Sequence, residues 1–135
     1  MAVHISVVDD EAAMRKTLAE AITAWANVAR VNVRISEYPS AKAFLFAYEE
    51  KKGCDILLAD IEMDGINGVE MAEQVRLEDD SIQIVFITGY PDYMSRGYDV
   101  SALHYLLKPL SEEKLSEVLD RAMKNIERKG RRLIL

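Results

Sequence analysis

Four short hydrophobic runs divide the chain. They cover residues 5–8, 56–59, 84–87 and 103–107, and the stretches between them carry apolar residues at helical spacing. Short apolar runs separated by helix-period segments predict buried parallel strands of an α/β sheet. All strands of such a sheet point the same way, so their C-terminal ends open onto one edge, where ligands bind. Functional residues are therefore expected directly after these runs.

The residues that follow the four runs are carboxylates, a hydroxyl and an ammonium. Asp9 and Asp10 follow the first run, Asp60 the second, Thr88 the third and Lys108 the fourth. Three carboxylates packed together repel one another, and a hard divalent cation such as Mg²⁺ relieves that repulsion. A hydroxyl and an ammonium beside the cation suit the oxygens of a phosphoryl group. The sequence therefore predicts one site for a cation and a phosphoryl group.

A further stretch, residues 31–36, alternates strictly between apolar and polar residues. Alternation indicates a strand with one buried face, so we place this second strand at an edge of the sheet. The strand order 2-1-3-4-5 does so, and its topological switch lies between the strands that end in Asp10 and Asp60. With helices between the strands, the predicted fold is a flavodoxin-like (βα)5 three-layer sandwich with a parallel five-stranded sheet.

Helical periodicity predicts five helices. Four are well marked, over residues 12–26, after the N-cap Ser40, over 69–77 and after the N-cap Ser111. The remaining one, over residues 91–99, contains a glycine and has little apolar face. We expect that helix to be short and mobile, because few apolar contacts would hold it.

Composition limits the classes of function. A net charge of −6 argues against a domain that grips nucleic acid by itself. The chain has no apolar run of about 20 residues that could span a membrane. Its single cysteine, Cys54, cannot form an internal disulfide, and a reduced thiol suits the cytoplasm.

The order of these polar residues resembles the receiver domain of bacterial two-component response regulators. The resemblance implies that Asp60 is the phospho-acceptor and that Lys108 and Thr88 contact the phosphoryl group. It implies Mg²⁺ as the cofactor, bound directly by Asp10 and Asp60, partly through water by Asp9, and by the backbone carbonyl of Glu62. It also implies a cis bond from Lys108 to its following proline.

The family's switch aromatic falls three residues before the lysine, at Tyr105. By resemblance, Thr88 moves to a new phosphoryl group and Tyr105 swings into the vacated space. The implied partner is a sensor histidine kinase, and the domain itself acts as a regulatory phospho-acceptor rather than an enzyme on other substrates. We expect a homodimer through the surface formed by the helix at 91–99, the strand at 103–107 and the helix after Ser111.

Two positions depart from the family's commonest pattern. The proline usually found four residues after the acceptor is Asp64, and the acid often found before the switch tyrosine is His104. The segments 60–65 and 105–109 look like receivers joined to a LytTR-type DNA-binding domain. We expect residues 1–127 to form the receiver, 128–135 to be a basic tail or the start of a linker, and DNA to be bound only through a domain absent from this chain.

Several other functions remain open on the sequence alone. The domain could be a stand-alone receiver or a phosphorelay intermediate. A phosphatase of the haloacid dehalogenase type also uses an aspartyl nucleophile, but there the nucleophile ends the first strand and the acidic pair comes last. A flavodoxin-like binding protein would need a Ser/Thr/Gly-rich phosphate loop after the first strand, and none follows it.

Overall fold

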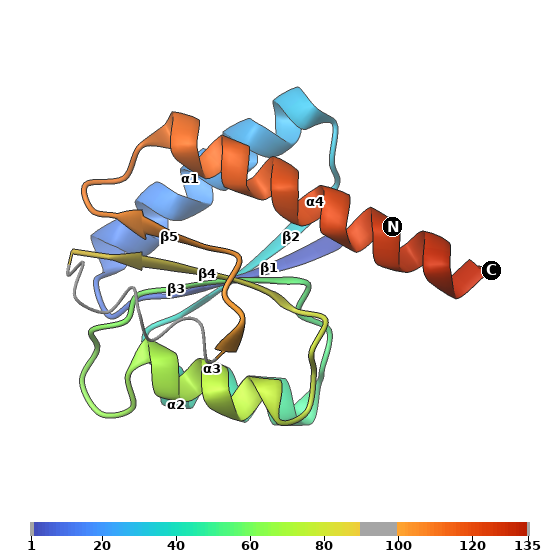
Figure 1. Cartoon of the computed structure of the whole chain (residues 1–135). Helices are drawn as coiled ribbons and strands as arrows, with labels where there is room; N and C mark the ends of the chain where they lie inside the picture. The colour runs from blue at the N-terminus through green and yellow to red at the C-terminus, as the bar shows by residue number, and fades with distance from the viewer. Residues whose placement is uncertain (1, 90–99, 135) are drawn as a thin grey trace.

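The computed structural model describes residues 2–89 and 100–134, with side chains up to residue 128 (Figure 1). Strands and helices alternate along the chain up to residue 88. The helix expected over residues 91–99 falls outside the described residues. The elements are β1 Val3–Val8, α1 Ala12–Ala29, β2 Val33–Tyr38, α2 Ala41–Glu50, β3 Ile56–Ala59, α3 Gly68–Arg76, β4 Gln83–Thr88, β5 His104–Leu107 and α4 Glu112–Ile134.

The five strands form one parallel sheet in the order β2-β1-β3-β4-β5, as the sequence predicts. Every residue of β3 and β4 is buried, which explains their unbroken apolar runs. The strand β2 lies at the edge, and none of its residues is fully buried. The predicted fold class is confirmed.

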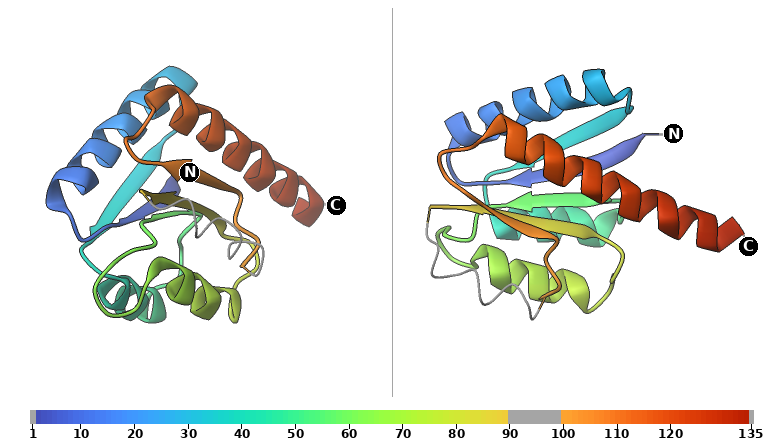
Figure 2. Two further views of the ribbon diagram at one scale, coloured as in Figure 1. Left: turned by 60° about the vertical axis from the view of Figure 1, so that its left-hand side comes forward. Right: turned by 45° about the horizontal axis from the view of Figure 1, so that its top comes forward.

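In the part of the chain that the structure describes, two helices cover each face of the sheet. Figures 1 and 2 show α1 and α4 on one face and α2 and α3 on the other. The strands supply alternate side chains to the two cores: Ile5 and Val7 pack toward α1 and α4, whereas Val8 packs toward α2 and α3. The result is a three-layer sandwich around two hydrophobic cores.

Side-chain caps begin the helices where the sequence predicts them. Ser40 Oγ accepts a hydrogen bond from the backbone N–H of Ala43, and Ser111 Oγ accepts one from Lys114. The first helix runs to Ala29, three residues past the predicted end, because no glycine or proline interrupts it. It ends at Arg30, which adopts a left-handed conformation with φ 57°.

The last helix, α4, is the helix expected after Ser111, and its backbone remains helical to Ile134. The boundary predicted at residue 127 therefore falls inside a continuous helix, and the division into a domain and a tail stays a prediction. Among the described residues, no helix is both long and apolar enough to cross a membrane.

Candidate functional site

The predicted site residues lie at one edge of the sheet. Backbone hydrogen bonds hold them there by continuing the strand ladder past the strand ends: Asp9 N–H donates to Tyr38, and Asp60 N–H donates to Val8. In the same way, the backbone N–H of Lys108 donates to the carbonyl of Thr88 at 2.8 Å. The parallel sheet therefore brings residues 99 positions apart in the chain, Asp9 and Lys108, to one place.

Three carboxylates form a cluster at this edge. Asp9, Asp10 and Asp60 each place a carboxylate oxygen within 4.8 Å of the others. The Asp9 and Asp60 residues are 1% and 6% exposed, whereas Asp10 is open to solvent. An all-oxygen donor set with one open side suits Mg²⁺, which binds few carboxylates and keeps several waters.

Lys108 bridges the two buried carboxylates. Its Nζ lies 3.2 Å from Oδ2 of Asp9 and 3.2 Å from Oδ2 of Asp60. The same nitrogen lies 3.7 Å from Oε1 of Glu11, a residue that we did not assign to the site from the sequence. One ammonium therefore offsets part of the negative charge of several acids.

Burial and neighbouring charges shift the pKa values in this cluster. Burial raises the pKa of Asp60 above the usual value for an aspartate; Lys108 opposes this rise and Asp9 adds to it. Burial by itself would lower the pKa of the Lys108 ammonium, but Asp60 and Asp9 raise it above the usual lysine value. Lys108 is therefore held as a cation beside the carboxylates.

The two predicted switch residues lie on neighbouring strands. Thr88 ends β4 and is fully buried, and Tyr105 lies within β5, partly buried. The Tyr105 ring packs against Phe86 of β4, with 5.3 Å between ring centroids. The bond between Lys108 and Pro109 is cis, as the resemblance implies.

The backbone after Asp60 also faces its carboxylate. The N–H of Glu62 donates to Oδ1 of Asp60 at 3.3 Å. This hydrogen bond fixes one carboxylate oxygen, while Lys108 approaches the other. The role of the Glu62 carbonyl as a metal ligand stays a prediction.

Gly68, the first residue of α3, contributes to the site in a way that sequence reasoning missed. A Cβ at this position would approach the Asp60 carbonyl oxygen much more closely than the 3.0 Å that real contacts respect. The backbone N–H of Gly68 donates a hydrogen bond to the carbonyl oxygen of Ile61 at 2.8 Å. The capping box formed by Asn67 and Glu70, which starts α3 here, was the available sequence signal.

Arg15 was also missed. Its Nη1 donates to the backbone carbonyl of Asp9 at 2.8 Å, and its Nε lies 3.8 Å from Glu37. This contact joins α1 to the end of β1 and braces the backbone that carries the acidic pair. In the sequence Arg15 looks like an ordinary surface arginine of a helix, so no local pattern indicated that it contacts the site.

A parallel sheet in this order, with a buried aspartate after β3 and a lysine that bridges it to Asp9 after β1, is the arrangement expected of a receiver domain. The sequence profile of the response regulator receiver domain matches residues 5–120. The chain belongs to this family. The cluster of Asp9, Asp10 and Asp60 is the kind of acidic pocket at which receiver domains bind Mg²⁺.

Relatives with curated names support the same family. The sensory transduction protein LytT of Oceanobacillus iheyensis is 30% identical over 131 residues, which cover 96% of this chain and 51% of that protein. LytT of Bacillus subtilis is 29% identical over 123 residues, covering 90% of this chain and 48% of that protein. The chain spans about half the length of these relatives.

Solved structures match the whole fold. The response regulatory domain of mrkE from Klebsiella pneumoniae has a TM-score of 0.83 at 21% identity, covering 93% of this chain and 99% of that one. TrrA from Thermotoga maritima, in complex with Mg²⁺ and BeF, has a TM-score of 0.76 at 26% identity, covering 89% and 98%.

Proposed function

We propose that Asp60 accepts a phosphoryl group from a sensor histidine kinase and that the domain thereby acts as a phosphorylation switch. The observation that carries this proposal is the position of Lys108, 3.2 Å from both Asp60 and Asp9. A buried nucleophilic carboxylate, an ammonium and two further acids are the groups that phosphoryl transfer needs for alignment and charge stabilisation.

The transfer is a displacement at phosphorus. An oxygen of the Asp60 carboxylate forms the new P–O bond while the bond from phosphorus to the kinase histidine nitrogen breaks. The electron pair of the broken bond stays on that nitrogen. The Lys108 ammonium, already beside Oδ2 of Asp60, then pairs with an oxygen of the new phosphoryl group. The Glu62 N–H faces the other carboxylate oxygen and orients the nucleophile.

Asp9, Asp10 and Asp60 and the backbone carbonyl of Glu62 are the proposed metal ligands. Bound Mg²⁺ supplies positive charge for the phosphoryl oxygens. The three carboxylates fit this ion because their oxygens converge and the exposed Asp10 leaves one side open to water. We propose that Asp10 binds directly and Asp9 partly through water, since Lys108 already pairs with Asp9.

Thr88 and Tyr105 are the proposed switch. The Thr88 hydroxyl would hydrogen-bond to the new phosphoryl group, and the Tyr105 ring would move toward the vacated space. Phosphorylation adds about −1.5 to −2 charges, so the two states differ in the contacts that they offer these side chains. The adjoining surface of β5 and α4 holds a groove that includes His104, Ser111 and Arg121.

We propose that activation strengthens a homodimer through α4, β5 and the segment of residues 90–99, which lies outside the described residues. Since the LytT relatives are about twice as long as this chain, we also propose a LytTR-type DNA-binding domain as the output of the full-length protein. A stand-alone receiver and a phosphorelay intermediate are the alternatives. The expected cytoplasmic location stays a prediction.

Incubation with a small-molecule phosphodonor and Mg²⁺ tests the proposal. We expect one phosphoryl adduct per chain by intact-mass spectrometry, dependent on Mg²⁺ and lost slowly by hydrolysis. Asp10→Ala should weaken the Mg²⁺-dependent phosphorylation more than Asp9→Ala, because Asp10 is the proposed direct ligand. Steady release of phosphate from unrelated phosphoesters would instead favour the haloacid dehalogenase-type phosphatase, and the absence of both an adduct and phosphate release would contradict both functions.

A further inference from the structure

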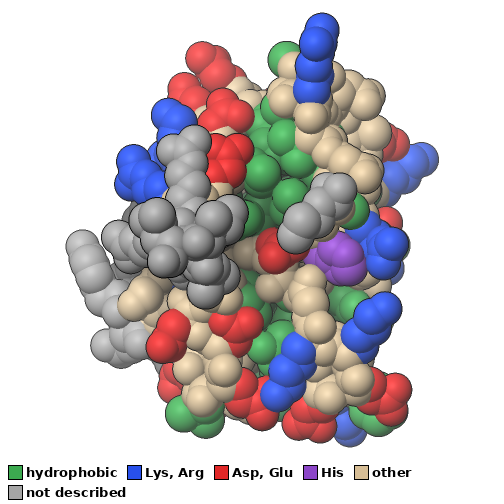
Figure 3. Space-filling view, turned by 90° about the vertical axis from the view of Figure 1, so that its right-hand side faces the viewer, with side chains coloured by type: hydrophobic (Ala, Val, Ile, Leu, Met, Phe, Trp, Pro, Cys, Tyr) green, Lys and Arg blue, Asp and Glu red, His purple; other side chains and the backbone are tan. Residues whose placement is uncertain are grey.

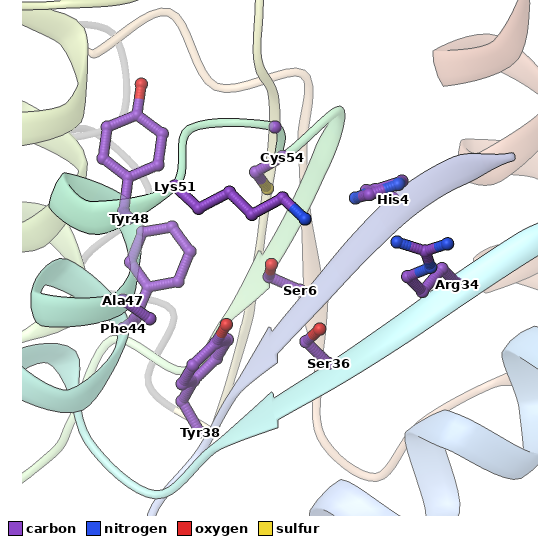
Figure 4. Close-up of a pocket in the computed structure, with 11 residues that line it drawn as sticks. His4, Ser6, Arg34, Ser36, Tyr38, Phe44, Ala47, Tyr48, Lys51 and Cys54 are labelled. Atoms are coloured by element: carbon purple, nitrogen blue, oxygen red, sulfur yellow. The ribbon is translucent and has the colours of Figure 1, made fainter.

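A hollow of about 280 Å³ lies between α2 and the edge of the sheet formed by β1 and β2, on the face away from α1 and α4. The strands line it with alternate residues, which share one face of the sheet. Figure 4 shows these side chains on the strands β1 and β2 and beside α2. The polar residues around the hollow are His4, Ser6, Arg34, Ser36, Tyr38 and Lys51.

Three separate elements aim basic groups at this hollow. His4 comes from β1, Arg34 from its register partner position on β2, and Lys51 from the residue after α2. Figure 4 shows Lys51 reaching across the hollow toward His4 and Arg34. Figure 3 views the edge at which the strands begin, where a histidine lies with Lys or Arg side chains on one side and an Asp or Glu side chain on the other.

No acidic side chain of the described residues lines the hollow, although the chain has a net charge of −6; the carboxylate of Asp55, which is not part of the lining, accepts the backbone N–H of His4 at 2.8 Å. Among the described residues, neither Arg34 nor Lys51 takes part in an ion pair. Like charges that face one space without a counter-charge repel, so these side chains gain from an anion between them. The positive charge of these side chains is therefore what we expect of a site that binds an anion from outside the chain.

The rest of the lining suits an organic anion. The hydroxyls of Ser6 and Ser36 sit side by side on the two strands, and Ser6 is largely buried. The aromatic rings of Tyr38, Phe44 and Tyr48 form the wall under α2. Arginine and hydroxyl donors match carboxylate and phosphate oxygens, while aromatic walls accept an apolar body.

We infer that this hollow binds a small oxyanion, with Arg34 and Lys51 as the charged contacts and the two serine hydroxyls as further donors. A volume near 280 Å³ is at the small end for ligand sites, which restricts the ligand to a compact metabolite with a phosphate or carboxylate group. The inference is independent of phosphorylation at Asp60, because none of the residues in that site lines the hollow.

Titration of the isotope-labelled chain by NMR tests this inference. Two probes distinguish the sources of the oxyanion: pyrophosphate for phosphates and succinate for carboxylates, each in metal-free buffer at constant ionic strength set with sodium chloride. We expect saturable shifts of the Ser6 and Ser36 amides with at least one probe. Shifts confined to the residues around Lys108, or no saturation with either probe, would overturn the inference.

Variants at positions that line the hollow, and one at a position that does not, complete the test. The double variant Arg34→Gln/Lys51→Gln should bind the probe about tenfold more weakly, because it removes two charged donors. Lys42→Gln changes an exposed lysine of α2 that does not line the hollow, and should bind like the original chain. Ser36→Leu keeps the charges but fills the space, so it should abolish binding. Equal affinity in the double variant and in Lys42→Gln would contradict the inference.

Discussion

Gly68 lies so close to Asp60 that a Cβ would press into the carbonyl oxygen of the aspartate. The contact joins the first turn of α3 to the backbone that carries the proposed phospho-acceptor. Only a residue without a side chain lets the two backbones approach this closely. The glycine thus sets where the end of β3 sits relative to the helix.

Gly68→Ala should therefore destabilise the domain by about 1–3 kcal/mol, because the added methyl group forces the backbone at Asp60 or Ile61 to shift. Urea unfolding followed by circular dichroism measures this change. Gly53→Ala is the matched control, since its Cβ would meet His4 only at an ordinary 3.8 Å. Equal losses in the two variants would contradict the role of the close approach.

Trp25 ties α1 to α4 through a hydrogen bond from its indole Nε1 to Oδ1 of Asp120, at 2.9 Å. Asp120→Ala should cost about 1 kcal/mol of stability and shift the Trp25 fluorescence, since the indole N–H loses its acceptor. Glu127→Ala, an exposed acid on the same helix, is the control. Unchanged emission in Asp120→Ala would show that the hydrogen bond does not form in solution.

Cys54 should react slowly with alkylating reagents. Burial raises the pKa of its thiol to about 11, and its Sγ–H donates to the carbonyl of Ile56 at 3.3 Å. Since the reactive species is the thiolate, alkylation at pH 8 should be on the order of a hundredfold slower than in urea-unfolded chain. Similar rates in folded and unfolded chain would contradict the assigned pKa.

The same shift makes stability depend on pH. The pKa of the thiol in the folded chain lies above the unfolded value of about 8.5. The protonated thiol's contribution to the free energy of unfolding is therefore complete below about pH 8.5. It is lost as the pH rises through the folded value of about 11. Cys54→Ala should remove this part of the pH dependence, which urea unfolding at pH 8 and pH 10 would measure.

Much of the fold follows from hydrophobic periodicity. The unbroken runs of β3 and β4 are buried on both faces, and the alternating β2 is at the edge, as the sequence indicates. The cluster of Asp9, Asp60 and Lys108 was predictable because parallel strands end at a common edge. These features depend on local pattern and on one topological rule.

Other features depend on contacts that no local pattern records. Glu11 approaches Lys108, and Arg15 reaches the Asp9 carbonyl, only because the folded backbone brings them together. The hollow between α2 and the strands β1 and β2 was also not predictable from local pattern. His4, Arg34 and Lys51 lie far apart in the chain, and each looks like an ordinary surface residue. Their common location emerges from the sheet register and from the end of α2.

Phosphorylation should change self-association through Thr88. Ordinary allosteric couplings supply about 1–3 kcal/mol, so we expect a partial shift toward dimer of about 5- to 150-fold in the association constant. Analytical ultracentrifugation with and without a phosphoryl mimic measures this shift. It should be lost in Thr88→Ala and kept in Thr17→Ala, an exposed threonine of α1. An equal shift in both variants would exclude Thr88 as the link.

The position of the phosphoryl group tests the central claim most directly. After incubation with a small-molecule phosphodonor and Mg²⁺, peptide mapping by mass spectrometry locates the adduct. We predict that it lies on Asp60, the buried carboxylate that Lys108 contacts at 3.2 Å, and that Asp60→Asn carries none. Undiminished labelling of Asp60→Asn, or an adduct mapped to another residue in the original chain, would contradict the account.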